Sequence, residues 1–115
     1  MHELSLCQSI YGIARRAAGG RRVTQVALDV GQLRQVVPQT LARCWQVVTA
    51  GTPLAGAELA VNHIPARAVC QDCGAGLAPG PALRLVCGGC GGHRLRIEAG
   101  EEFLVRSIDV AGEPP

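Results

Sequence analysis

Two cysteine pairs stand in the stretch CQDCGAGLAPGPALRLVCGGC, residues 70–90. Two residues separate the cysteines of each pair, a spacing that lets one tight turn, a knuckle, aim both sulfurs at a common point. Thirteen residues separate the two pairs. Four thiolates from two knuckles form the tetrahedron that zinc adopts in closed structural sites. The spacing therefore predicts a zinc site with four ligands: Cys70, Cys73, Cys87 and Cys90.

Other interpretations of the four cysteines are disulfides, a redox dithiol and an iron–sulfur cluster. Disulfides conflict with a reducing cytosolic location, which we infer because Met1-His2-Glu3 lacks the basic and then apolar profile of a signal peptide. A thioredoxin-like dithiol needs one pair at the start of a helix. An iron–sulfur cluster accepts four thiolates as well. We favour zinc, and four thiolates leave no open position for hydrolytic chemistry, so we expect no enzyme.

The segment around these cysteines has little material for a core. Residues 70–92 are dominated by Cys, Gly and Pro, with few large apolar side chains. So short a piece does not bury enough surface to fold unaided. We therefore expect an inserted, zinc-ribbon-like module that the metal holds together.

The flanking sequence has the periodicity of helices and strands. A helix is predicted from Glu3 to Ala18 and ends at Gly19-Gly20. Residues 23–30 alternate, with Val26, Leu28 and Val30 on one face, and predict a half-buried strand. The apolar stripe of the helix consists of Leu4, Cys7, Ile10, Tyr11, Ala14, Ala17 and Ala18.

A second helix and two more strands complete the predicted fold. The helix begins near Pro38, which suits a first turn, and ends at Gly51. Strands are predicted over residues 58–64 and 103–110, the latter with inward-facing Leu104, Ile108 and Val110. A strand, helix and strand in succession imply parallel pairing. The fold class is α+β: two helices on a small three-stranded mixed sheet, with the inserted module.

Composition excludes several classes of protein. The chain has 115 residues, is 48% hydrophobic and carries a formal charge of +2. A core is therefore expected, and no dedicated nucleic-acid or membrane surface is indicated. No apolar run approaches the roughly 18–20 residues of a membrane span.

The remaining cysteines and histidines have simple interpretations. Cys7 and Cys44 lie on apolar helical stripes and are expected to be small buried hydrophobes. His93 follows the second pair, where it is either a solvent-facing loop residue or a residue that contacts the zinc site. His63 is expected on the surface of a strand.

The N-terminus offers a second metal site. The Met1 amine, the His2 backbone nitrogen and His2 Nδ1 can chelate one ion, and the Glu3 amide can be a fourth donor. Such nitrogen sets favour square-planar Ni(II) or Cu(II). Any chain beginning Met-His would qualify, and Glu3 also suits the start of a helix. These residues alone favour an ordinary solvated N-terminus.

The whole chain resembles the HypA family of nickel metallochaperones, the hydrogenase maturation factors. The resemblance rests on Met1-His2-Glu3-Leu4-Ser5-Leu6, Gly51-Thr52, Gly56-Ala57-Glu58-Leu59, both cysteine pairs, Gly100-Glu101-Glu102-Phe103-Leu104-Val105 and Ser107-Ile108. It implies Ni²⁺ as transferred cargo, with His2 as the principal ligand and Met1 and Glu3 beside it. It also implies structural Zn²⁺ on the four cysteines. The resemblance therefore reverses our interpretation of the N-terminus.

The resemblance also implies partners and an organisation in two domains. A HypB-type GTPase and the precursor of the [NiFe]-hydrogenase large subunit are the expected partners, in the cytoplasm, and some relatives serve urease maturation. Residues 1–66 plus 97–115 would form a discontinuous nickel-binding domain, and residues 67–96 the zinc-binding domain. Gln32 departs from the family, which often has Glu there, and the second knuckle, Cys-Gly-Gly-Cys, lacks a frequent Pro.

An alternative function is that of a zinc-ribbon adaptor associated with nucleic acid. It requires a basic or aromatic stripe on the ribbon. Residues 70–96 offer only Arg84, Arg94 and Arg96, and no aromatic ring. The sequence therefore favours the metallochaperone.

Overall fold

The computed structural model describes residues 2–111, which form two compact units. Within that range the first unit contains residues 2–29, 36–62 and 104–111. The second contains Val30–Gln35 and His63–Phe103. The second unit is thus wider than the inserted segment 67–96 considered above, because it also holds the end of one strand and the turn at residues 100–102. Among residues 2–111, no helix has the length and apolar character needed to span a membrane.

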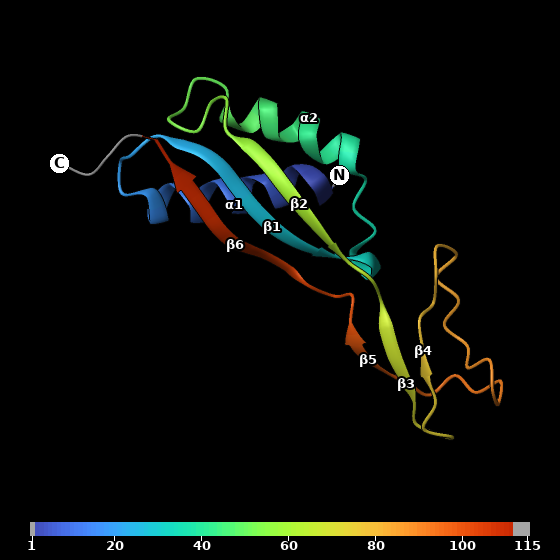
Figure 1. Ribbon diagram of the computed structural model, residues 1–115. Coiled ribbons are helices and arrows are strands. Elements are labelled where there is room, and N and C mark those ends of the chain that lie inside the picture. Colours follow the sequence, from blue (N-terminus) through green and yellow to red (C-terminus); the bar gives the residue numbers. More distant parts are fainter. Residues whose placement is uncertain (1, 112–115) are drawn as a thin grey trace. The chain divides into compact units, whose positions relative to one another are not determined.

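A three-stranded mixed sheet organises the first unit. Its order is β2-β1-β6, with β1 over Val23–Gly31, β2 over Glu58–Ile64 and β6 over Phe103–Val110. Figure 1 shows β1 and β2 running in the same direction and β6 in the opposite one. The helix α2, Pro38–Thr49, connects the two parallel strands. The fold class and the parallel pairing predicted from the sequence are confirmed.

The helix α1, His2–Ala18, lies behind the strands in Figure 1. It ends where Gly19 and Gly20 take positive φ angles of 59° and 88°, a conformation that costs glycine little. The predicted apolar stripe is wrong at two positions, since Leu4 is 39% exposed and Ala17 is exposed. The buried row is Glu3, Cys7, Ile10, Ala14 and Ala18. Leu4 lies one position off this row, and a carboxylate takes the place expected for an apolar side chain.

The core of the first unit lies between the helices and the sheet. The alternation predicted for β1 is confirmed, because Val26 and Leu28 are fully buried. Trp45 of α2 is 3% exposed, and its Nε1–H donates to the Ala57 carbonyl at 2.9 Å. This bond pairs the indole's polar group, so the largest ring of the chain is buried without an orphaned donor.

The two cysteines outside the pairs differ in their surroundings. Cys7 is fully buried, and its Sγ lies 3.4 Å from the Leu41 carbonyl oxygen. Burial raises the pKa of the Cys7 thiol to about 11, so it stays protonated and behaves as the small hydrophobe that was predicted. Cys44 is only half-buried, so the prediction of a buried side chain is wrong there.

Strand β6 departs from the predicted alternation. Leu104, expected to face inward, is 47% exposed, while Phe103 and Val105 are half-buried. Arg106 and Ser107 are both exposed, so the alternation changes phase between them. Ile108 and Val110 then take the half-buried positions, as expected.

The second unit contains a small antiparallel sheet in addition to the three predicted strands. Its order is β4-β3-β5, with β3 over Arg67–Cys70, β4 over Gly76–Leu77 and β5 over Leu95–Ala99. These strands have two to five residues and few fully buried positions. Such short strands carry almost no periodic signal. A 3₁₀ turn at Gln32–Arg34 also belongs to this unit.

Candidate metal centres

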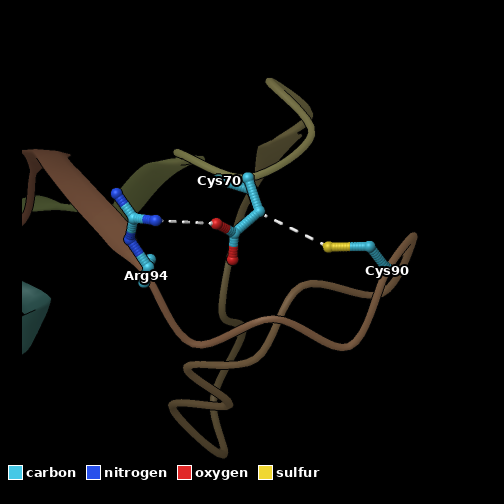
Figure 2. A network of polar contacts seen from close by, with 4 residues as sticks. Cys70, Cys90 and Arg94 are labelled. Atoms are coloured by element: carbon cyan, nitrogen blue, oxygen red, sulfur yellow. Dashed lines mark hydrogen bonds and ion pairs between the residues drawn. The ribbon is translucent and has the colours of Figure 1, made fainter.

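The four paired cysteines converge on one point in the second unit. Their Sγ atoms all lie within 4.8 Å of one another. The closest approaches join one knuckle to the other: 3.6 Å between Cys70 and Cys90 (Figure 2) and 3.5 Å between Cys73 and Cys87. A tetrahedron with zinc–sulfur bonds of about 2.3 Å has sulfurs about 3.8 Å apart. The four cysteines are free rather than in disulfides, and they fit a tetrathiolate zinc site.

The two knuckles have the same backbone hydrogen bonds. In the first, the Gly74 amide donates to the Cys70 carbonyl at 2.7 Å, and the Cys70 amide donates to the Ala75 carbonyl at 2.9 Å. In the second, the corresponding bonds, of 2.8 and 2.9 Å, join Gly91 and Gly92 to Cys87. The glycine after each pair has a positive φ, 78° at Gly74 and 74° at Gly91. These glycines permit the turn that directs both sulfurs of a pair inward.

Backbone amides favour a thiolate at one member of the cluster. The amides of Cys90 and Gly89 lower the pKa of the Cys87 thiol to about 7. At Cys90 the Gly92 amide also lowers the pKa, but the neighbouring thiols of Cys70 and Cys73 outweigh it and raise the pKa to about 12. The backbone amides therefore favour a thiolate at Cys87, whereas the neighbouring thiols oppose one at Cys90.

Neither His63 nor His93 is part of the four-cysteine cluster. His93 and His63 are both exposed, and neither belongs to the group of potential ligands found among the described residues. His93 is thus the solvent-facing loop residue, and His63 lies on the surface of β2. Asp72, inside the first knuckle, pairs with Arg94 at 3.2 Å on the surface of the same unit. An exposed pair of this kind stabilises the fold by about 1 kcal/mol at most.

The second candidate site lies at the start of α1. His2 is the first helical residue, and its side chain is 55% exposed. Its Nδ1 lies 3.5 Å from Glu3 Oε1. The first amides of a helix have no partner within the helix backbone, and such a nitrogen can bind an ion only after it loses its proton. Met1, the third member of the predicted nickel set, lies outside the described residues.

Glu3 connects this site to the second helix. Only 7% of its side chain is exposed, and Oε2 accepts the Val37 N–H at 3.2 Å. Val37 is the residue that precedes α2. This bond is the largest cause that lowers the pKa of the Glu3 carboxyl. No pattern in the sequence points to this contact, because the donor is a backbone amide whose position depends on how the two helices pack.

We expect the Glu3 carboxyl of the metal-free chain to titrate below its ordinary pKa of 4.5. Because the folded pKa is lowered, the stabilisation it brings is present at neutral pH and is lost as the pH falls through the lowered value. The variant Val37→Pro removes the N–H at a φ of −86°, close to what proline accepts. The pKa of the Glu3 carboxyl should be higher in Val37→Pro than in the wild-type chain.

Carbon-13 NMR of the Glu3 carboxyl measures this titration directly. Val37→Ala is the matched control, because it removes the same side chain and keeps the N–H. The same Glu3 pKa in Val37→Pro and Val37→Ala would show that the bond does not set the charge.

Comparisons with known proteins agree along the whole chain. The HypA family model, described as "Hydrogenase/urease nickel incorporation, metallochaperone, hypA", matches residues 1–110. The hydrogenase maturation factor HypA of Geobacter sulfurreducens is 38% identical over 110 residues, which cover 96% of this chain and 99% of that protein. The HypA of Rhizobium leguminosarum bv. viciae is 38% identical over 113 residues, with 96% and 99% covered.

Two solved structures share the fold. The solution structure of the nickel metallochaperone HypA from Helicobacter pylori has a TM-score of 0.66 at 16% identity, covering 96% of this chain and 98% of that one. A second HypA solution structure has a TM-score of 0.68 at 19% identity, with 98% of both chains covered. These two likenesses show the fold, and the family model together with the 38%-identical relatives shows that the chain belongs to the HypA family of nickel-incorporation metallochaperones.

Proposed function

We propose that this chain binds Ni²⁺ at Met1, His2 and Glu3 and delivers it during maturation of [NiFe]-hydrogenase. The observation that carries the proposal is the pairing of an exposed His2 imidazole with a buried Glu3 carboxylate in the first turn of α1. Membership of the HypA family supports nickel as the metal and its incorporation as the function.

In this proposal, each of the first three residues has a different role. The imidazole of His2 is the principal ligand, and the Met1 amine and the backbone nitrogens beside it complete a nitrogen set suited to Ni²⁺. Oε2 of Glu3 is committed to the Val37 amide. The side chain of Glu3 therefore holds the first turn in place, and its backbone nitrogen and negative charge serve the ion.

We further propose that Cys70, Cys73, Cys87 and Cys90 hold a structural Zn²⁺. Zinc in this position would join the two knuckles through four thiolates and offer no open coordination site. The residues supply what such a site needs: four sulfurs within 4.8 Å of one another, and amides that stabilise a thiolate. In this proposal, residues 67–96 act as the zinc-binding domain of a chain whose remaining residues bind nickel.

Delivery requires release to a partner. Few side chains need to move when an ion leaves the end of a chain, and protonation of the imidazole or the amine ejects it. We propose that the cytoplasmic partners are a HypB-type GTPase and the hydrogenase large-subunit precursor, and that urease maturation proteins are a second client.

The delivery function is tested in a bacterium that makes [NiFe]-hydrogenase and lacks its own HypA. The wild-type chain should restore hydrogenase activity at limiting nickel, and His2→Ala should restore roughly a tenth or less, since one ligand accounts for much of the affinity. His63→Ala, an exposed histidine elsewhere in the chain, is the control and should restore full activity. Equal restoration by His2→Ala and wild type would refute delivery from the N-terminal site.

A further inference from the structure

The side-chain amide of Gln32 lies between two segments of the second unit. Its Oε1 accepts the Ala66 N–H at 2.8 Å, and its Nε2 donates to the Gly80 carbonyl at 2.6 Å. A backbone amide only donates and a carbonyl only accepts, so the orientation of the Gln32 amide is fixed by its partners. The bridge needs one donor and one acceptor at the end of the same side chain.

Each end of this bridge leads to one of the knuckles. Ala66 immediately precedes β3, whose last residue is Cys70 of the first knuckle. Gly80 belongs to a turn that precedes Cys87 of the second knuckle. In that turn the Leu83 amide donates to the same Gly80 carbonyl at 3.0 Å, and the Arg84 amide donates to Pro79 at 3.3 Å. Gln32 thus joins the two chain segments that carry the sulfurs.

Gln32 is itself held by its neighbours in the chain. The Gly31 amide donates to the Glu102 carbonyl at 2.7 Å, and the Leu33 amide donates to the Gly100 carbonyl at 2.8 Å. A side chain at Gly31 would overlap the Gly100 carbonyl, so the two segments approach as closely as backbone allows. The bridge therefore starts from a fixed backbone, so that the side-chain entropy of Gln32 is the main entropy lost when it forms.

We propose that Gln32 is a positioning residue that preorganises the four-cysteine site by holding both knuckle-bearing segments. The inference rests on the proposed zinc site and deepens it. With the bridge in place, the two pairs of sulfurs have already lost much of their relative freedom before the metal binds, and preorganisation of this kind strengthens binding. Without it, one segment can move away while the other still holds the ion, and zinc leaves sooner.

The variant Gln32→Glu tests the bridge with a side chain of the same size. A carboxylate still accepts the Ala66 N–H, but it places an oxygen against the Gly80 carbonyl where a donor stood. We expect zinc to pass to a competing chelator roughly tenfold faster than from the wild-type chain, the effect of losing one part-buried hydrogen bond and setting a carboxylate oxygen against the Gly80 carbonyl. Gln8→Glu, an exposed change of the same charge on α1, should release zinc at the wild-type rate.

A second readout separates positioning from a damaged site. Co²⁺ in place of zinc should give the same tetrathiolate absorption spectrum in Gln32→Glu and wild type, since the ligands are unchanged. Gln32→Met, which lacks both polar groups and the added charge, should release zinc at least as fast as Gln32→Glu. Wild-type release rates in both variants would overturn the inference, as would a spectrum that has lost a sulfur ligand.

The zinc site and the bridge can fail separately. If wild-type protein takes up no zinc, the proposed site is wrong. If it takes up one zinc per chain and the Gln32 variants release it at the wild-type rate, only the positioning role is wrong.

Discussion

Replacing His2 by Ala is expected to weaken Ni²⁺ binding roughly 100-fold or more. Loss of a residue that merely supports a metal ligand costs 10–100-fold in affinity, and His2 is proposed as the ligand itself. The substitution removes an exposed imidazole at the first position of α1. It leaves the Glu3 bond to Val37 untouched, so the helix start should keep its structure.

The measurement is an isothermal titration of zinc-loaded protein with Ni²⁺, with a free N-terminus. His93→Ala is the matched control, because it removes an exposed histidine near the cysteines and should leave the nickel affinity unchanged. Acetylation of the Met1 amine should weaken binding as His2→Ala does, since it replaces a basic amine by an amide that must lose its proton before it can bind the ion. Equal nickel affinity in His2→Ala and wild type would place the nickel site elsewhere.

Cys73→Ser should abolish stoichiometric zinc binding and unfold the second unit. Structural zinc contributes about 10–16 kcal/mol of apparent binding free energy in small domains, which exceeds what this unit can gain from burial. Its buried side chains are small: Val30, Ala66, Ala68, Pro79, Cys70 and Cys87. The first unit keeps its own core, with Ile10, Leu28, Leu41 and Trp45 buried. It should therefore stay folded.

Zinc content per chain and the amide NMR spectrum check this result. Cys44→Ser is the control, because Cys44 lies on α2 outside the cluster and should retain one zinc. In Cys73→Ser the amides of residues 67–96 should collapse to unfolded positions while those of α1 and α2 persist. Retention of tight zinc, or collapse of both units together, would contradict the prediction.

The regular elements of the first unit follow from sequence because their signals are strong. Pro38 begins α2, and the paired glycines after residue 18 end α1, as their backbone preferences require. The predictions for α1 are wrong where tertiary packing, rather than polarity, determines which side chains are buried. Leu4 has the right polarity for a core position, yet the buried row passes through Glu3, whose carboxylate is satisfied by an amide 34 residues away.

The four cysteines could be assigned from spacing alone, because two short pairs restrict where their sulfurs can point. The strands and hydrogen bonds around the four cysteines could not be predicted in this way. The small strands β3 to β5 have too few residues to show a period. Gln32 is distant in sequence from both of its partners, and they are backbone atoms without a residue type to recognise. Tertiary hydrogen bonds of this kind leave no local pattern in the sequence.

The repeated knuckle has a consequence for the order in which the site assembles. Each knuckle closes through bonds between residues only four or five apart, and loops this short close in well under a microsecond. Two sulfur pairs can therefore form and dissolve many times before an ion arrives. Once one pair captures the ion, the other is tethered nearby at an effective concentration on the order of millimolar. Capture is then a two-stage process, in which the first encounter depends on the free zinc concentration and the second does not.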